Sequence, residues 1–417
     1  MNPRHIYAKL RDALSDTPAV LLRGARQTGK TTLAKSLCAE EGRNYLTFDS
    51  VSTLAAAKAD PAGFVRELNK PVVIDEIQRV PEVFLPIKAD IDENRNPGRY
   101  LLTGSANAMT LPGIADSLAG RMEVLTLFTL SQGEIAGEHD DFIAKMFEPE
   151  FNPPSLSVPV KTAKDIFSLM VMGGYPEIAT RARPERRAAW FESYLTTLVE
   201  RDARDLANIQ DRGVLPRLFS LLAARGGTLH NAADLGRTLG LNGMTLARYT
   251  AILEAMFLVW FLPAWSVNLG KRLLKSPKVN LSDSGFACHL CGADEKRLSL
   301  DSALAGRLFE SFVATEMRKQ ASWSDENVRL YHYRSQSGDE VDLVFENRSG
   351  QIAGMEIKLS NGVAPRDYKG LSRMRDALGD RFRRGVLIYT GSDILPLGEK
   401  LVALPIGALF LQRQGSV

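Results

Sequence analysis

Short apolar runs alternate with helical stretches over the first third of the chain. The runs begin at Ala19, Asn44, Pro71, Arg99 and Met122. Each has the length and apolar character of a buried parallel strand. Strands that alternate with helices are typical of an α/β domain with a parallel sheet. We therefore expect a multidomain α/β protein that begins with such a sheet.

The middle of the chain follows a different pattern. From Gly137 to Thr162 the periodicity is lost and prolines accumulate, which is typical of a loop or linker. Apolar residues at helical spacing then return, as in the predicted helix from Glu185 to Asp205. The predicted organisation is an amino-terminal α/β domain, a linker, a helical and winged-helix domain and a carboxy-terminal domain, at residues 1–137, 138–162, 163–290 and 291–417.

The helical domain contains the pattern of a helix-turn-helix. A short helix capped by Asn231 is followed by a turn at Gly240 and a second helix over 242–256. Val259–Leu262 and Lys278–Leu281 are candidate wing strands. Such a domain either binds DNA or only packs against its neighbours.

If the winged helix binds DNA, two residues of the second helix are the candidate contacts. Arg248 and Tyr249 could touch a phosphate or a base, and Arg272 is a further candidate. The chain as a whole has a net charge of only +3, so contact with nucleic acid has to be local.

Composition indicates a cytoplasmic protein outside the membrane. A hydrophobic share of 45% and a charged share of 24% are ordinary for globular proteins. The 3 cysteines are too few for a disulfide framework, which suits a reducing compartment. The longest apolar run, 255–262, is too short to span a bilayer, which needs about 20 residues.

The clearest chemical signal follows the first predicted strand. Residues 24–31 fit G-x-x-x-x-G-K-[ST], the phosphate-binding loop of nucleotide hydrolases, and a helix follows. Its N–H groups surround phosphates, Lys30 reaches the outer phosphates and Thr31 holds Mg²⁺. The predicted nucleotide contacts of this loop are Gly24, Ala25, Arg26, Gln27, Thr28, Gly29, Lys30, Thr31 and Thr32.

Two acids end the third predicted strand, and small polar residues end the fourth. In a parallel sheet both groups would lie beside the phosphate loop. We expect Asp75 to hold Mg²⁺ through water or through Thr31, and Glu76 to polarise the attacking water. Ser105 is the predicted contact to the γ-phosphate, with Thr103 and Asn107 as alternates.

Arg121 precedes the fifth predicted strand. An arginine at a nucleotide site stabilises the charge that develops in the transition state. The sequence leaves open whether Arg121 serves its own site or that of a neighbouring subunit, or is a surface residue at the start of a strand.

These motifs together resemble the AAA-type ATPase module of a large prokaryotic family. Its members are described as ATP-binding proteins with a carboxy-terminal domain of unknown function. The similar segments lie at 24–31, 72–78, 102–107 and 118–121. The resemblance implies a five-stranded parallel sheet flanked by helices. Two further segments also resemble segments of this family, Lys275–Lys278 and Asp283–Gly285. The sequence shows no physical reason why the family would need these residues.

The carboxy-terminal part has a second candidate site. A helix carrying Glu310 is followed by a strand carrying Asp342 and a strand carrying Glu356 and Lys358. This order is that of the PD-(D/E)xK nuclease core, although Val341 stands at the nominal proline. The three carboxylates would hold a second Mg²⁺ or Mn²⁺, and Lys358 would hold the nucleophile or offset charge. A structural ion-pair cluster with the same residues is the alternative.

The sequence thus favours an ATPase that uses ATP and Mg²⁺ and is coupled to binding or cleavage of DNA or RNA. One alternative is an ATP-dependent conformational switch that acts on a protein partner through an inactive nuclease-like domain. Another is a nucleotide-gated DNA-binding regulator. The oligomeric state stays open.

Overall fold

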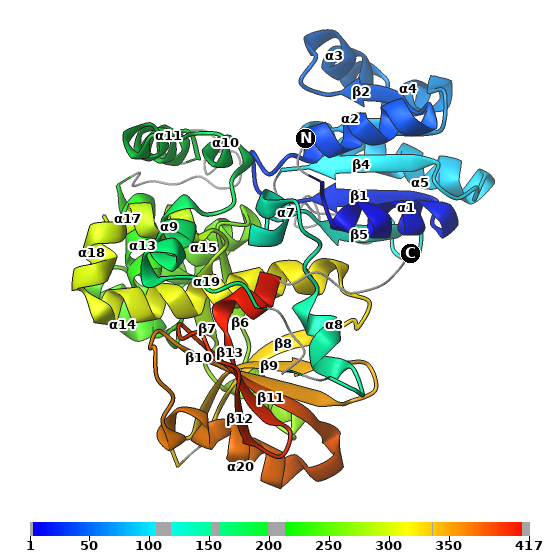
Figure 1. Ribbon diagram of the computed structural model, residues 1–417. Coiled ribbons are helices and arrows are strands. Elements are labelled where there is room, and N and C mark those ends of the chain that lie inside the picture. Colours follow the sequence, from blue (N-terminus) through cyan, green and yellow to red (C-terminus); the bar gives the residue numbers. More distant parts are fainter. Residues whose placement is uncertain are drawn as a thin grey trace. The chain divides into compact units, whose positions relative to one another are not determined.

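The computed structural model (Figure 1) divides into two compact units. The amino-terminal unit comprises Pro3–Thr129 and Glu254–Leu258, and the carboxy-terminal unit comprises Leu130–Leu253 and Val259–Val417. Among the described residues, no helix is long and apolar enough to cross a membrane. The structure describes residues 3–105, 118–151, 153, 158–198, 213–335 and 337–410.

A five-stranded sheet with the order β2-β3-β4-β1-β5 forms the centre of the amino-terminal unit. All of its neighbouring strands are parallel, which confirms the predicted sheet. The strands are β1 (Ala19–Arg23), β2 (Asn44–Thr47), β3 (Val72–Asp75), β4 (Tyr100–Gly104) and β5 (Met122–Thr126).

Alternate strand residues of this sheet enter two apolar cores, one on each face. Leu21 and Ile74 belong to one core, which also contains Ile87 of a helix. Val20 and Val73 belong to the other core. Because side chains alternate along a strand, a strand buried on both faces reads as a continuous apolar run. The helices of this unit are α1 (Ile6–Asp16), α2 (Lys30–Glu41), α3 (Val51–Ala59), α4 (Pro61–Glu67) and α5 (Phe84–Glu93).

Helix α5 is tied to the sheet through Asp90. Arg99 donates two hydrogen bonds to this carboxylate, of 2.6 and 2.8 Å, and Tyr100 donates a third of 2.5 Å. Lys70 lies 3.2 Å away. Burial by itself would raise the pKa of Asp90, but the hydrogen bonds from Arg99, Tyr100 and Lys70 outweigh it and lower this pKa to about 2.

We expect Asp90→Asn to lower the free energy of unfolding of the amino-terminal unit by about 2–3 kcal/mol at pH 7, because two cations lose their carboxylate. The folded-state pKa of Asp90 lies below the unfolded value, so its contribution is complete above about pH 4 and is lost towards pH 2. Urea unfolding of both proteins between pH 7 and pH 3 measures this difference.

The matched control for this prediction is Glu93→Gln, an exposed acid on the same helix, which should change stability by less than about 0.5 kcal/mol. A stability difference for Asp90→Asn that grows as the pH falls below 4 would contradict the proposed ion pairs.

The carboxy-terminal unit begins with helices. The predicted helix from Glu185 to Asp205 is present as α11 up to Thr197, and residues 199–212 lie outside the described part of the chain. These helices are α7 (Gln132–Ala136), α8 (Phe142–Phe147), α9 (Ala163–Met172), α10 (Pro176–Ala179), α11 (Pro184–Thr197) and α13 (Val214–Ala224).

Helix α8 lies inside the stretch that the sequence predicts to be a linker, 138–162. All six of its residues are buried, and Asp141 caps it by accepting a hydrogen bond from the N–H of Ala144. The helix has fewer than two turns, so its apolar residues do not repeat often enough to show helical periodicity. This part of the predicted linker is therefore packed structure.

Two helices and two strands lie where the sequence predicts them, and their assignment to a winged helix stays a prediction. The side chain of Asn231 caps α14 (Ala232–Leu239), and Gly240 adopts a left-handed conformation at the end of that helix. Helix α15 (Gly243–Ala255) follows, and β6 (Val259–Leu262) pairs antiparallel with β7 (Lys278–Leu281). Binding of DNA by these elements stays a prediction. The next helices are α16 (Leu269–Leu274), α17 (Ser284–Leu290) and α18 (Glu295–Leu300).

The last part of this unit is a mixed six-stranded sheet with the order β12-β13-β11-β10-β9-β8. Helix α20 (Lys369–Leu378) contacts β9, β10 and β11, and the long α19 (Ser302–Trp323) contacts β10 and β7 (Figure 1). The predicted middle domain and carboxy-terminal domain thus lie in one compact unit. The strands are β8 (Arg329–Arg334), β9 (Glu340–Glu346), β10 (Ile352–Lys358), β11 (Phe382–Tyr389), β12 (Leu395–Gly398) and β13 (Leu401–Pro405).

Candidate functional site

The predicted phosphate loop connects β1 to α2. Gly29 has a φ of 95° immediately before α2, in the left-handed region that favours glycine. Gly24 is required for a different reason, because a Cβ atom there would lie 2.1 Å from the backbone oxygen of Leu127. Gly24 thus brings the loop close to the end of β5 at a place where a side chain does not fit, and Gly29 provides the left-handed backbone before α2.

Lys30 lies within this loop. Its Nζ atom donates hydrogen bonds to the backbone oxygens of Gly24 at 3.0 Å and Ala25 at 2.7 Å. The residue is only 5% exposed, and this burial lowers the pKa of Lys30 to about 8. A buried ammonium at the start of a helix is suited to meet an anionic phosphate.

Asp75, at the end of β3, binds the residue after Lys30. The hydroxyl of Thr31 donates to Oδ2 of Asp75 at 2.9 Å, and the hydroxyl of Tyr45 donates to the same oxygen at 2.7 Å. Thr103 donates to Oδ1. Thr31 and Asp75 therefore present two oxygen ligands side by side, the donor set that Mg²⁺ prefers.

Glu76 follows Asp75 with a φ of 59°, which is uncommon for a residue other than glycine. Its Oε2 atom accepts a hydrogen bond from Ser105 at 3.0 Å and another from Gln78. Gln78 also donates to the hydroxyl of Ser105 at 3.1 Å. The structure thus joins the predicted base and the predicted polar residue at the end of β4 in one triangle of hydrogen bonds. Asn107, an alternate to Ser105, lies outside the described residues.

Arg121 lies away from the loop. It directly precedes β5, which runs parallel to β1 with Met122 opposite Ala19, whereas the phosphate loop follows the other end of β1. Five residues of strand separate the two edges by about 16 Å. Arg121 instead forms a two-pronged ion pair with Asp92, with distances of 2.6 and 3.0 Å. Arg121 therefore does not serve the nucleotide site of its own subunit in this structure.

Two residues of this site were not predicted. Tyr45 and Gln78 contact the acids, but their types do not distinguish them from ordinary strand and turn residues. Gln78 reaches back to Glu76 because a 3₁₀ turn, Ile77–Arg79, follows the strand. The one signal for Gln78 in the sequence is its position two residues after Glu76.

The four predicted residues of the carboxy-terminal site come from α19, β9 and β10. Lys358 lies 3.2 Å from Oε2 of Glu356 and 3.9 Å from Oδ2 of Asp342. The N–H of Ile357 donates to the same Oδ2 of Asp342 at 3.0 Å. Glu310 reaches this cluster through another residue, which the sequence predicts as part of a wing strand and not as part of this site.

That residue is Lys278 of β7. Its Nζ atom lies 2.5 Å from Oε1 of Glu310 and 3.0 Å from Oδ1 of Asp342. Burial would raise the pKa of Asp342, but Lys278 and Lys358 outweigh it and lower this pKa to about 2. Burial and the charge of Asp342 raise the pKa of Glu356 well above its ordinary value. Among the described residues, no three carboxylate, histidine or cysteine side chains are grouped so that they could hold a metal ion.

The predicted DNA-contacting residues differ in their exposure. Arg248 is exposed, but Tyr249 is buried in the core. Arg272 donates to the backbone oxygen of Ser266 at 2.6 Å and binds both carboxylate oxygens of Glu346. Tyr249 and Arg272 are therefore occupied inside the fold, whereas Arg248 lies at the surface.

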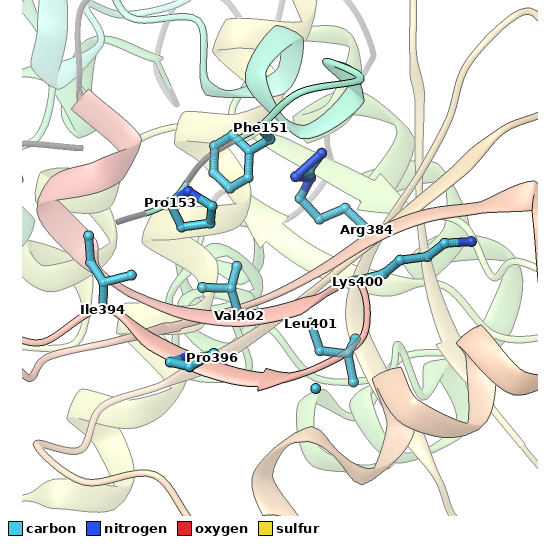
Figure 2. Close-up of a pocket in the computed structure, with 9 residues that line it drawn as sticks. Phe151, Pro153, Arg384, Ile394, Pro396, Lys400, Leu401 and Val402 are labelled. Carbon is cyan, nitrogen blue, oxygen red and sulfur yellow. The ribbon is translucent and has the colours of Figure 1, made fainter. Parts of the chain in front are cut away.

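A cavity of about 240 Å³ lies beside β12 and β13 (Figure 2). Its lining is mostly apolar, and Arg384 and Lys400 are its cations. The guanidinium of Arg384 stacks 4.2 Å from the centre of the Phe151 ring and donates to the backbone oxygens of Met146 and Glu148. None of the predicted site residues lines this cavity.

Comparison with known families finds three matches along the chain. Residues 16–136 match a family described as "AAA domain". Residues 163–297 and 305–409 match two families described as "Domain of unknown function", DUF8612 and DUF4143 respectively. The first unit is thus a P-loop ATPase-like domain with a parallel sheet, as its geometry also indicates.

Two solved structures have a limited likeness to this chain. The Walker-type ATPase PABY2304 of Pyrococcus abyssi has a TM-score of 0.43 and 14% identity, over 70% of this chain and 96% of that chain. The RuvB Holliday junction branch migration motor of Thermotoga maritima has a TM-score of 0.31 and 21% identity, over 62% of this chain and 89% of that chain. These likenesses are too low to say anything about function.

Relatives in sequence span almost the whole chain. The uncharacterized protein Rv2008c of Mycobacterium tuberculosis is 32% identical over 406 residues, which are 96% of this chain and 83% of the relative. The uncharacterized protein Mb2031c of Mycobacterium bovis has the same identity and coverage. In this chain an AAA domain precedes two domains of unknown function. By its identity and coverage the chain belongs to the family of these two mycobacterial proteins.

Proposed function

We propose that this protein binds ATP with Mg²⁺ and hydrolyses it at the loop between β1 and α2. One observation carries the proposal: a buried lysine, a hydroxyl and two carboxylates converge at the ends of β1 and β3, the two parallel strands on either side of β4. The loop N–H groups and Lys30 would bind the phosphates. Thr31 and Asp75 would hold Mg²⁺, which supplies charge neutralisation at the outer phosphates when it is bound.

Glu76 is the proposed base. It would accept a proton from the water that attacks the γ-phosphorus, while the bond to the β-phosphate oxygen breaks and ADP and phosphate form. Ser105 and Gln78 support this role, because their hydrogen bonds fix the carboxylate at the end of β3. Arg121 would contribute only to the site of a neighbouring subunit, since it lies at the other edge of its own sheet.

Phosphate release by the purified full chain tests the proposal. We expect turnover of ATP that requires Mg²⁺ and stops when EDTA removes the metal. A folded chain that binds no nucleotide at micromolar to millimolar concentration would contradict it.

For the carboxy-terminal unit, an observation favours the switch over the nuclease. The mixed sheet and the order of Glu310, Asp342, Glu356 and Lys358 support a nuclease-like fold. However, two of the three acids already share the ammonium of Lys278. We therefore infer that ATP hydrolysis changes how this unit holds a protein or nucleic-acid partner, without cleavage by the unit itself.

We expect the wild-type chain to cut no single- or double-stranded DNA or RNA above the background of Asp342→Asn, with either Mg²⁺ or Mn²⁺. The ammonium of Lys278 lies 3.0 Å from Oδ1 of Asp342, and its charge would repel a divalent metal at this carboxylate. Gel analysis of labelled substrates measures cleavage, and Glu340→Gln on the same strand is the control. Cleavage that Asp342→Asn abolishes and Glu340→Gln preserves would restore the nuclease hypothesis.

A further inference from the structure

Lys278 comes from a segment of the sequence that the ATPase function does not explain. The segment Lys275–Lys278 resembles a segment of the prokaryotic ATPase family. In the structure its last residue, Lys278, contacts two acids. The ammonium lies between Oε1 of Glu310, at 2.5 Å, and Oδ1 of Asp342, at 3.0 Å. Both acids belong to the set that the sequence predicts as ligands of a divalent metal. A cation therefore already bridges them.

We propose that Lys278 is a built-in cation that replaces a divalent metal in the carboxy-terminal carboxylate cluster, so that the folded protein binds no metal ion there. The inference goes beyond the ATPase and concerns only residues of the carboxy-terminal unit.

The charges of the cluster support this replacement. Three carboxylates, Glu310, Asp342 and Glu356, meet two ammonium groups, Lys278 and Lys358. A divalent ion placed beside Lys278 would be repelled by that ammonium at a short distance, and burial leaves little water to screen the repulsion. Cations of the chain itself thus offset the charge of two of the three acids.

The hydrogen bonds of Asp342 point to the same conclusion. Its Oδ1 atom accepts from Lys278, and its Oδ2 atom accepts from the N–H of Ile357 at 3.0 Å. Mg²⁺ requires oxygen ligands at about 2.0–2.1 Å in near-octahedral geometry. An ion bound to Oδ1 of Asp342 would therefore lie beside the ammonium of Lys278. The described hydrogen bonds of Asp75, by contrast, come from neutral hydroxyl groups.

Lys278 is also held in place by its backbone. It pairs with Leu262 of β6, and on its other side it forms a bridge with Leu229. The N–H of His230 donates to the backbone oxygen of Pro277 at 2.8 Å. The residue is 7% exposed. Since the backbone is fixed on two sides and the ammonium would lose buried partners by leaving, the lysine is a permanent member of the cluster.

Binding of Mn²⁺ to the nucleotide-free full chain tests the proposal, with free Mn²⁺ measured by electron paramagnetic resonance. We expect the wild-type chain and Asp342→Asn to bind Mn²⁺ equally. We expect Lys278→Met, which removes the ammonium but keeps an apolar side chain of similar length, to gain one site at least tenfold tighter. Adding Asp342→Asn to Lys278→Met should abolish that site.

Lys275→Met is the matched control, because this lysine is exposed on the same segment and contacts the backbone oxygen of Arg334 and the ring of Tyr333 instead of the acids. It should gain no Mn²⁺ site. Lys278→Arg keeps a cation in the cluster and should gain none either. Circular dichroism and thermal unfolding establish that each variant is folded.

Two results would overturn the proposal. One is a Mn²⁺ site in the wild-type chain that Asp342→Asn removes, and this comparison decides the question even where Lys278→Met does not fold. The other is a folded Lys278→Met that gains no site. Because nucleotide is absent throughout, failure of the ATPase proposal would leave both results unaffected.

Discussion

Lys30→Ala should weaken ATP binding about 100-fold or more. The ammonium of Lys30 is buried in the loop and is held by two backbone oxygens, so it is already positioned where phosphates would meet it. Loss of a buried charged partner costs about 2–5 kcal/mol, and each 1.4 kcal/mol is about tenfold in the dissociation constant. Titration of a fluorescent ATP analogue measures the change.

The control for this variant is Lys35→Ala, on the same helix α2. Lys35 is exposed, and its described contact is with the ring of Tyr45, at 5.1 Å. It carries the same charge, so a general loss of positive charge would affect both variants equally. We expect the dissociation constant of Lys35→Ala to stay within about threefold of the wild-type value, since exposed charges contribute little.

Folding has to be separated from binding in this comparison. Removing the ammonium leaves the oxygens of Gly24 and Ala25 without this donor, but a small change in the loop can expose them to water. A Lys30→Ala protein that unfolds at the wild-type temperature and still binds ATP with wild-type affinity would mean that the loop is not the nucleotide site.

The sequence is sufficient to predict the parallel sheet and the loop because both depend on local pattern. An apolar run such as Val72–Asp75 is buried on both faces of the sheet, so nearly every residue of it is apolar. The loop depends on glycines at fixed positions, which the sequence gives directly. These features require no knowledge of distant segments.

The position of Arg121 could have been deduced from the sequence. A residue that precedes a parallel strand lies at the amino edge of the sheet, and phosphate loops follow strands at the carboxyl edge. Once β5 is parallel to β1, Arg121 and Lys30 must lie at opposite edges. The residue type suggested a role that the strand direction does not allow within one subunit.

Lys278 could not have been deduced in this way. It contacts Glu310 and Asp342, which lie 32 and 64 residues further along the chain. No periodicity or spacing connects a strand after a helix-turn-helix to a carboxylate cluster in a later sheet. Such a contact depends on how β7 packs against α19, which is a property of the tertiary fold alone.

Glu76→Gln should bind ATP and hydrolyse it about 10²- to 10⁴-fold more slowly, the range that a general base contributes. The amide has the shape of the carboxylate, and its oxygen can still accept the hydrogen bond from Ser105. It cannot accept a proton from water, so the chemical step loses its base while the phosphate contacts of the loop remain.

Two measurements separate these effects. Titration with a fluorescent ATP analogue should give a dissociation constant within about threefold of the wild-type value, because Glu76 is not expected to contact the phosphates. Single-turnover hydrolysis should then show the full decrease, which excludes slow release of product as its cause. Glu82→Gln, an exposed acid in the following turn, should match the wild type in both assays.

Ser105→Ala provides the intermediate case. It removes one hydrogen bond to Glu76 but leaves the carboxylate and the hydrogen bond from Gln78, so we expect a smaller decrease than for Glu76→Gln. If Ser105 contacts the γ-phosphate directly, the affinity for ATP should fall as well. Undiminished single turnover by Glu76→Gln would show that the base is a different group, whatever Ser105→Ala does.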